Sequence, residues 1–350
     1  MLRKQGRQKV QINKIYQGNN LDILKTFEDN SINCCITSPP YYGLRDYGTG
    51  KWIGGDPNCD HKQAKLATRF DYDVSDKQYS NAGSNVPMYQ KVCPICGAIR
   101  EDKQVGLEES PEMYIQRLVD IFTEVKRVLK DDGTLWVNIG DTYNASSYRK
   151  DENSSGHGKQ GTNKGSYENV VERPTVQNCK PKDLIGIPWM LAFALRDSGW
   201  YLRQDIIWAK PNPMPEPIKD RCGKSHEYIF LFSKSPKYYF DYEAIQEPCW
   251  ASNTQGMKTM TGKRNKRDVW TVVPAHYKEA HFATFPEELV YPMIIAGCPK
   301  DGVVLDPFMG SGTVGSVAIK NHRNYVGCEL NPDYIDMALR RINHTTIKLF

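Results

Sequence analysis

The 350-residue sequence has no long apolar runs. No stretch approaches the roughly 20 consecutive apolar residues that cross a bilayer, and the basic amino-terminal segment contains no apolar signal-peptide core. We therefore expect a cytoplasmic protein with no membrane partner. The content of apolar residues, 39%, and of charged residues, 25%, is typical of a soluble globular protein.

An excess of one charge is also missing, because 46 basic residues face 41 acidic ones and leave a net charge of +5. The local distribution is more informative than the total. Residues 258–267, KTMTGKRNKR, contain five basic residues and no acidic one. Such a run is either a solvated loop or the charge pattern expected beside a phosphate backbone. In a reducing cytoplasm, the ten cysteines are best interpreted as buried thiols or metal ligands.

Internal repeats are absent, and apolar strands alternate with amphipathic helices. The strand at 32–36 precedes a helix that begins at Pro111 and stops by Gly133, and a strand at 134–140 follows. This alternation predicts an α/β fold, a doubly wound, mostly parallel sheet with helices on both faces. The other expected elements are helices at 188–198, 285–297, 314–321 and 331–342 and strands at 200–210, 226–234, 238–242, 302–306 and 324–330.

Three segments lack this pattern and suggest a domain organisation. Residues 49–106 are rich in Gly, Asp, Asn, Lys and Tyr, and we expect them to be an inserted lobe. Residues 144–180 are polar and of low complexity, and residues 244–280 are irregular and basic, so both are expected to be flexible or recognition insertions. Residues 1–48 and 107–350 would then form the main domain.

A glycine-rich loop near the carboxyl terminus predicts a nucleotide site. DPFMGSGTVG at 306–315 follows a strand and opens a helix, and Glu329 lies 19 residues after Gly310, where an acid that binds ribose is expected. No lysine follows the glycines, so the loop is not a phosphate-gripping P-loop. An adenosine ligand is expected.

Two interpretations of this ligand stay open. A dinucleotide fingerprint normally opens its domain, but only 35 residues follow Gly315, so most strands must come earlier. Asp306 is also an added acid before the glycines, and it suits a ligand with a cationic amino end, such as S-adenosylmethionine. We favour S-adenosylmethionine over a dinucleotide.

A second motif, CCITSPPYYG at 34–43, ends an apolar strand on two prolines. Proline fixes φ and removes a donor, and it holds the residue before it extended. Ser38 and the carbonyl of Pro39 are thus rigid acceptors at a strand tip, next to aromatic residues that suit a flat, amine-bearing group. By itself the segment could equally be an ordinary tight turn.

TSPPYYG at 37–43 followed by DPFMGSGT at 306–313 resembles the DNA amino-methyltransferases, in the permuted order that places the catalytic motif first. The resemblance implies a Rossmann-like fold and catalytic roles for Ser38, Pro39, Pro40 and Tyr41. HFATFPEEL at 281–289 resembles the segment that closes over the methionine end of the cofactor. The implied cofactor residues are Asp306, Phe308, Gly310, Ser311, Gly312, Thr313, Glu329 and Phe285, with Asn19 added where the family often has Asp and this chain has GNN at 18–20.

The chemistry expected is methylation of an exocyclic amine in double-stranded DNA. Two acceptors, Ser38 Oγ and the Pro39 carbonyl, would localise the nitrogen lone pair, and Tyr41, ahead of Tyr42, would stack on a base flipped out of the duplex. Serine at the first motif position favours cytosine N4 over adenine N6, by the resemblance. Carbon-5 methylation is disfavoured because the Pro-Cys pair of EPCW is not at a strand tip. A restriction nuclease as partner is left open.

Cys59-x-His61 and Cys93-x-x-Cys96, in VCPICGA, predict a structural zinc site. The alternative is free thiols beside an unrelated histidine. Cys34, Cys35, Cys298 and Cys328 lie in apolar contexts and are expected in the core.

Three other functions compete with DNA methylation. These are an NAD-type oxidoreductase that uses GSGTVG, a zinc-containing DNA-binding protein without catalysis, and a methyltransferase that acts on RNA or on protein amides.

Overall fold

The computed structural model describes residues 6–43, 49–61, 91–144, 179–213, 215–216, 218–252, 258–276 and 283–347. The chain divides into a first unit, residues 1–39, 115–140 and 188–350, and a second unit, residues 40–114 and 141–187. Most of the predicted insertion at 144–180, and the middle of that at 49–106, lie outside the described residues. Each unit is described by itself.

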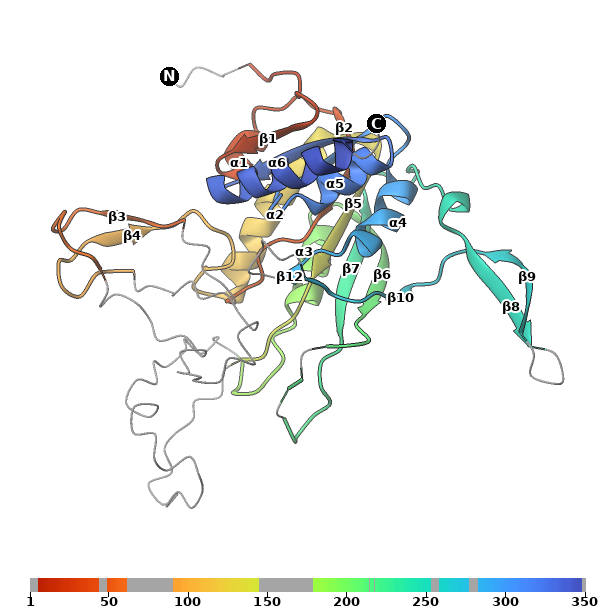
Figure 1. Cartoon of the computed structure of the whole chain (residues 1–350). Coiled ribbons are helices and arrows are strands. Elements are labelled where there is room, and N and C mark those ends of the chain that lie inside the picture. Colours follow the sequence, from red (N-terminus) through yellow and green to blue (C-terminus); the bar gives the residue numbers. More distant parts are fainter. Residues whose placement is uncertain are drawn as a thin grey trace. The chain divides into compact units, whose positions relative to one another are not determined.

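An eight-stranded sheet, in the order β1-β14-β13-β2-β5-β7-β6-β10, is the framework of the first unit (Figure 1). The run from β1 to β5 is parallel, β7 is antiparallel to both of its neighbours, and β10 is parallel to β6. The predicted mostly parallel sheet is thus confirmed, with one reversed strand. The strands are β1 (Lys14–Gln17), β2 (Ile32–Thr37), β5 (Leu129–Ile139), β6 (Tyr201–Ala209), β7 (His226–Ser233), β10 (Val269–Thr271), β13 (Val303–Asp306) and β14 (Asn324–Glu329).

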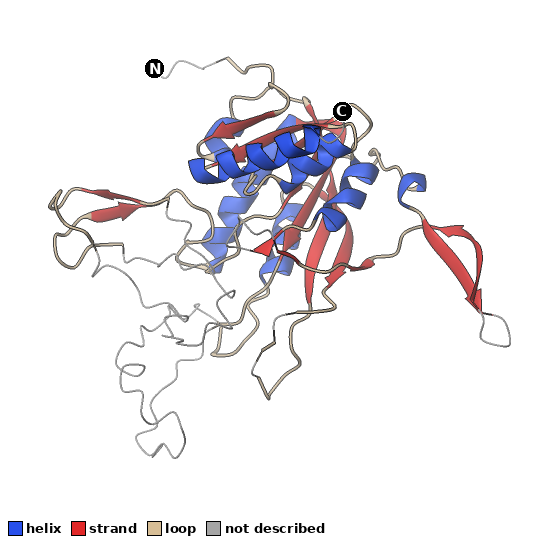
Figure 2. Ribbon diagram, viewed as in Figure 1, coloured by secondary structure: helices blue, strands red, loops and turns tan. Residues whose placement is uncertain are grey.

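Helices cover both faces of this sheet (Figure 2). Residues of α4, α5 and α6 share one buried cluster with Ile229 and Leu231 of β7. The side chain of Phe230 points to the opposite face, because successive strand residues alternate. There the ring of Trp189 in α3 packs edge-on against it, with ring centroids 5.4 Å apart. Lys126 of α2 donates to the carbonyl of Gly199, which follows α3. The helices are α1 (Asn20–Leu24), α2 (Pro111–Val128), α3 (Ile187–Asp197), α4 (Glu287–Gly297), α5 (Thr313–Lys320) and α6 (Pro332–Ile347).

The strand order reverses between β2 and β13. From β2 the chain crosses through α2 to β5 on one side, whereas from β13 it crosses through α5 to β14 on the other. In an open α/β sheet, ligands bind outside the carboxyl ends of the strands at such a switch point. The predicted motifs follow directly after these two strands.

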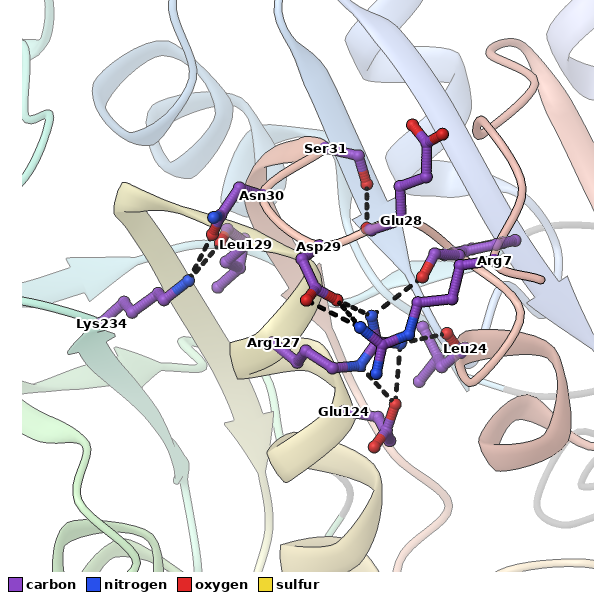
Figure 3. A network of polar contacts seen from close by, with 11 residues as sticks. Arg7, Leu24, Glu28, Asp29, Asn30, Ser31, Glu124, Arg127, Leu129 and Lys234 are labelled. Carbon is purple, nitrogen blue, oxygen red and sulfur yellow. Dashed lines mark hydrogen bonds and ion pairs between the residues drawn. The ribbon is translucent and has the colours of Figure 1, made fainter. Parts of the chain in front are cut away.

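Ion pairs fix the turn that leads into β2 (Figure 3). Arg127 of α2 donates to the carbonyls of Leu24, at 2.7 Å, and Phe27, at 2.9 Å, just after α1. Its guanidinium also pairs with Asp29, and this hydrogen bond holds the pKa of the Asp29 carboxyl below its ordinary value. Arg127 therefore ties α2 to the end of α1 and to the turn that follows it.

Three expectations about local structure are wrong. Residues 238–242 form no strand, because the Tyr239 N–H bonds to the carbonyl of Asp132 in β5 while the Asp241 N–H bonds to that of Ala296 in α4, so no regular ladder forms. Helix α2 ends at Val128 and not near Gly133, because Leu129 already pairs with Ile32 in the sheet. The segment expected to be irregular at 244–275 contains a separate two-stranded ribbon, β8 (Glu247–Ser252) and β9 (Lys258–Arg264), in addition to β10 (Figure 2).

The described part of the second unit contains a short two-stranded sheet and a closed turn. Its described strands β3 (Lys51–Ile53) and β4 (Ile99–Glu101) pair antiparallel, and Trp52 packs against Cys93 and Ala98. The carboxylate of Asp141 accepts hydrogen bonds from the backbone N–H groups of Thr142, Gly186 and Ile187 and so closes a turn. Among the described residues, no helix combines the length and apolar character that crossing a membrane requires.

Candidate active site

The two predicted motifs meet at the switch point. Strands β2 and β13 are neighbours in the register Leu305↔Cys35, so Thr37 and Asp306 both end at this edge. Thr37 Oγ1 donates a 2.7 Å hydrogen bond to Asp306 Oδ1, and both side chains are buried. Ser38 directly follows Thr37, which places the start of one motif beside the start of the other.

Burial dominates the chemistry of Asp306. It raises the pKa of the carboxyl to about 7, although hydrogen bonds from Thr37 and from the backbone N–H of Phe308 lower it. Nearby Glu329 adds a smaller upward effect. A cationic partner would stabilise the charged form of this buried carboxyl, so the site favours a ligand with a positive charge.

Glu329, at the end of β14, organises the glycine loop. One carboxylate oxygen accepts from the Gly310 N–H and the other from the Asn331 N–H, both at 2.8 Å. Desolvation raises the pKa of this carboxyl, whereas these backbone donors lower it. Glu329 thus ties the turn after β13 to the turn after β14, and the second lone pair of each oxygen is suited to a ribose hydroxyl.

Backbone conformation explains both glycines of the loop at 310 and 312, and close packing adds a second reason for Gly312. Gly310 and Gly312 have positive φ values of 49° and 78°. A Cβ on Gly312 would lie 2.7 Å from the Cβ of Ala338 in α6, so no other residue fits without a shift. Arg341 of α6 then donates to Thr313 at 2.7 Å and to Ser311 at 3.3 Å.

The start of α4 is linked to the same loop through Arg341 of α6. Phe285 packs against the core cluster, and Glu287 accepts a 3.1 Å hydrogen bond from Arg341 and pairs with Lys320. The N-terminal part of the predicted segment HFATFPEEL, residues 281 and 282, lies outside the described residues.

Asn19 and Asn20 occupy the turn between β1 and α1. Asn19 Oδ1 caps α1 by accepting from the Asp22 N–H at 3.3 Å, a local role that the sequence pattern did not indicate. Asn20 is buried and donates a 3.1 Å hydrogen bond to the carbonyl of Pro307, so it holds the turn after Asp306.

Behind Ser38 lies a chain of polar residues that the sequence motifs do not contain. Ser38 Oγ lies 3.3 Å from Oδ1 of Asn138 in β5. The Asn138 amide nitrogen donates at 3.1 Å both to Glu227 Oε2 and to the carbonyl of Tyr228. Glu227 also forms an ion pair with Lys210.

The remaining residues of the first motif belong to the second unit. The Pro40 carbonyl accepts a 2.8 Å hydrogen bond from the Tyr114 hydroxyl. Tyr42 packs against Tyr114 with ring centroids 5.6 Å apart, and burial raises the pKa of its hydroxyl. Tyr42 therefore takes part in packing within this unit.

The four predicted metal ligands come together in the second unit. The ligand atoms of Cys59, His61, Cys93 and Cys96 all lie within 4.8 Å of one another. The pair Cys59–Cys93 is separated by 3.8 Å and the pair Cys96–His61 by 3.7 Å. The backbone N–H of Ala98 holds the pKa of the Cys96 thiol below its ordinary value.

Buried cysteines are confirmed as core residues. Cys34, Cys35, Cys298 and Cys328 are each fully buried. Burial raises the pKa of each thiol, that of Cys298 to about 12, so none is a ready nucleophile.

Comparison with known proteins identifies the family. A family model described as DNA methylase, for N6 and N4 methyltransferases, matches residues 32–340. Type II methyltransferase M.Cfr9I of Citrobacter freundii is 42% identical over 94% of this chain and 87% of its own length. Type II methyltransferase M.SmaI of Serratia marcescens is 40% identical over 94% of this chain and 90% of its own length.

Solved structures share the fold. PvuII DNA methyltransferase (cytosine-N4-specific) superimposes with a TM-score of 0.56 at 17% identity, over 97% of this chain and 92% of that one. A DNA modification methylase of Thermus thermophilus, solved with S-adenosyl-L-methionine, gives 0.53 at 19% identity, over 95% and 93%. The chain belongs to the N6/N4 DNA methylase family and is a DNA methyltransferase, as the two motifs predicted, and not a dinucleotide oxidoreductase.

Proposed function

We propose that this methyltransferase uses S-adenosylmethionine to methylate an exocyclic base amine at specific sites in double-stranded DNA, with cytosine N4 as the favoured target. The observation that supports it most is the hydrogen bond between Thr37 and Asp306, which brings the ends of β2 and β13 together. The site then contains a candidate amine-binding motif and a candidate cofactor loop at one sheet edge.

The residues of the loop fit this cofactor. Buried Asp306 suits the amino group of the methionine moiety, and Glu329 suits the ribose hydroxyls. The glycines at 310 and 312 let a ligand approach the backbone, and the other proposed contacts are Ser311, Thr313, Phe308, Phe285 and Asn19. When bound, S-adenosylmethionine supplies a methyl group that its sulfonium has already activated.

The first motif would prepare the nucleophile. An exocyclic amine is weak because its lone pair is delocalised into the ring. Ser38 Oγ and the carbonyl of Pro39 would accept its hydrogens and so localise the pair, while Pro39 and Pro40 keep these acceptors rigid. Tyr41 would stack on the flipped base, since base–aromatic stacking offsets part of the unstacking cost. Serine at position 38 supports cytosine N4.

The experiment is a transfer assay with labelled S-adenosylmethionine, duplex DNA, RNA and protein as acceptors. Wild-type protein should label duplex DNA, and mass spectrometry of the digest should show N4-methylcytosine. Ser38→Ala should lower the transfer rate by about 100-fold or more, because one preorganised polar contact is worth that much, and leave cofactor affinity unchanged. Tyr41→Ala should likewise lose transfer. Ser198→Ala is the matched control, because Ser198 follows α3 and its hydroxyl donates to the carbonyl of Leu195 within that helix.

Label found only on RNA or protein would refute the DNA assignment. N6-methyladenine in the digest would refute the cytosine assignment alone, and the residue roles would stand.

We also propose a structural zinc ion at Cys59, His61, Cys93 and Cys96. Tetrahedral zinc with Zn–S bonds of about 2.3 Å needs sulfurs about 3.8 Å apart, and Cys59 and Cys93 have this separation. Four ligands leave no open position, so the ion would fold its lobe and take no part in the chemistry.

Recognition of a DNA sequence is proposed for the insertions. Residues 144–180 and 244–280 are the segments whose sequence lacks the core pattern. Although β10 of the second segment joins the main sheet, that segment also contains the β8–β9 ribbon, a shape that enters a major groove. The lobe at 49–106 remains a separate proposed domain.

A further inference from the structure

We infer that Lys210 and Glu227 are positioning residues that act through Asn138 to present the Ser38 hydroxyl as a hydrogen-bond acceptor. The inference rests on the proposed role of Ser38. It concerns residues that the two sequence motifs do not contain, on β7 and directly after β6.

These residues form a continuous chain at the edge of the sheet where the motifs end. Ile139 of β5 pairs with Tyr228 of the antiparallel strand β7, so the first residues of β7 lie beside the last residues of β5. Glu227 contacts Asn138 through one carboxylate oxygen and Lys210 through the other. The chain of contacts therefore runs Lys210, Glu227, Asn138, Ser38.

The hydrogen bonds of Asn138 determine which way its amide faces. Its NH2 group has two hydrogens, and Glu227 Oε2 and the Tyr228 carbonyl accept them, both at 3.1 Å. The amide oxygen is left to face Ser38, and a carbonyl oxygen can only accept. The Ser38 hydroxyl must therefore donate its proton to Asn138, and its lone pairs are available for the hydrogens of a substrate amine.

A flipped Asn138 would have the opposite effect. Its NH2 group would then face Ser38 and occupy a lone pair that the substrate amine needs. Glu227 opposes this flip because a carboxylate accepts only from the NH2 side, and a charged acceptor makes the stronger hydrogen bond. Asn138 is 2% exposed, so water cannot easily replace these partners.

Lys210 pairs with Glu227 and holds its carboxylate in place. The Glu227 side chain is only 14% exposed and that of Lys210 20%, and an unpaired carboxylate there would be costly. The ammonium of Lys210 also lies 4.4 Å from the ring centroid of Trp208, which restrains it. An ion pair that merely joined β6 to β7 would not need its second carboxylate oxygen aimed at Asn138, since the backbone already pairs Trp208 with Glu227.

The test replaces the ion pair by apolar residues of similar size, Lys210→Met with Glu227→Leu, so that no lone charge is buried. We expect kcat for DNA methylation to fall about 10- to 100-fold, as for a small misplacement of a catalytic group, with the KM for DNA and the Kd for S-adenosylmethionine unchanged. Lys210→Arg, which keeps the charge, should retain kcat. In an Asn138→Ala background the same replacement should have no further effect, because the link to Ser38 is already broken.

Two results with an active wild-type enzyme would overturn this inference and leave the proposed function intact. In the first, the pair variant keeps the wild-type kcat. In the second, the replacement lowers kcat by the same factor in the wild-type and in the Asn138→Ala background. If the pair variant no longer binds S-adenosylmethionine, Glu227→Gln replaces it, because this substitution keeps the size of the side chain. Its effect on kcat is then compared in the wild-type and Asn138→Ala backgrounds, by the same criterion. A wild-type protein that methylates no DNA overturns the proposed function, and this inference with it.

Discussion

Asp306 shows how one buried residue links folding to ligand binding. Its pKa of about 7 in the folded chain exceeds the ordinary value of 3.8, chiefly because of burial. The folded state therefore holds more protons than the unfolded state between these values, and the stability of the ligand-free protein falls as pH rises from about 4 to 7. The loss approaches ~4 kcal/mol, at about 1.4 kcal/mol for each pH unit.

The same carboxyl predicts the pH dependence of cofactor binding. A cationic amino group binds the carboxylate form, so binding releases the proton that Asp306 holds below about pH 7. We expect the Kd for S-adenosylmethionine to rise by up to about tenfold for each pH unit below 7. Calorimetry in buffers of different ionisation enthalpy should detect the released proton.

Asp306→Asn is the control for this prediction. The variant should bind S-adenosylmethionine more weakly at pH 8 and should lose the pH dependence between 6 and 8. A wild-type Kd that stays constant over this range would show that Asp306 does not meet the cationic end of the ligand.

At the scale of elements, Arg127 holds α1 and the turn before β2 in place (Figure 3). Its side chain is only 17% exposed. Arg127→Ala leaves the carbonyls of Leu24 and Phe27 without this donor, and we expect a loss of about 1–3 kcal/mol in the free energy of unfolding, measured in urea. Arg7→Ala is the comparison, because Arg7 contacts the same Asp29 from an exposed position and should change stability little. Equal effects of the two variants would contradict the role given to the backbone carbonyls.

Elements with a local signal could be predicted from the sequence. Strand β13, its loop and α5 are marked by apolar residues, glycines and a helix start within residues 302–321, and the structure follows that pattern. The cysteine and histidine spacing likewise indicated the four candidate zinc ligands, whose ligand atoms lie close together.

Features that depend on distant partners could not be predicted. Nothing around Lys210 or Glu227 shows that the two residues meet, because their contact follows from the antiparallel pairing of β6 with β7. Tyr238 and Phe240 have the composition of a strand, but the N–H groups of Tyr239 and Asp241 bond to β5 and to α4, respectively, and the segment joins no regular ladder. Asn19 suits a ligand as well as a helix cap, and only the folded turn shows the cap.

At the scale of the whole molecule, the proposed zinc site predicts how the second unit is stabilised. Among the described residues around the four ligands, the buried cluster contains only Cys93 and Ala98, so a metal would supply much of the folding free energy there. We expect purified protein to contain equimolar zinc by atomic emission, and Cys96→Ser to lose it. Cys222→Ser, an exposed thiol outside the cluster, should retain the metal. Zinc that is absent from the wild type, or retained by Cys96→Ser, would contradict the site.

The distribution of charge over the whole molecule predicts where DNA binds. Glu247 of β8 neutralises part of the positive charge of the basic run at 258–267, because it pairs with Arg264 at 2.9 Å and with Arg267 at 2.6 Å. Lys263, on β9, is exposed and is the residue to test. If the β8–β9 ribbon lies against a phosphate backbone, Lys263→Ala should weaken binding to all DNA sequences. It should also reduce the slope of log K against log salt by about 0.9, the value expected for a single phosphate.

Lys300 provides the matched control for this measurement. It is exposed and precedes β13, at the edge of the sheet opposite the active site, so its charge is the same but it does not belong to the ribbon. Lys300→Ala should leave the salt slope unchanged in the same fluorescence-anisotropy titration. A slope that changes equally in both variants would mean that only the net charge of the protein matters, and an unchanged slope for Lys263→Ala would remove this residue of the ribbon from the DNA interface. A selective decrease at Lys263 would place the ribbon beside the duplex, because the slope reports the counterions that each neutralised phosphate releases.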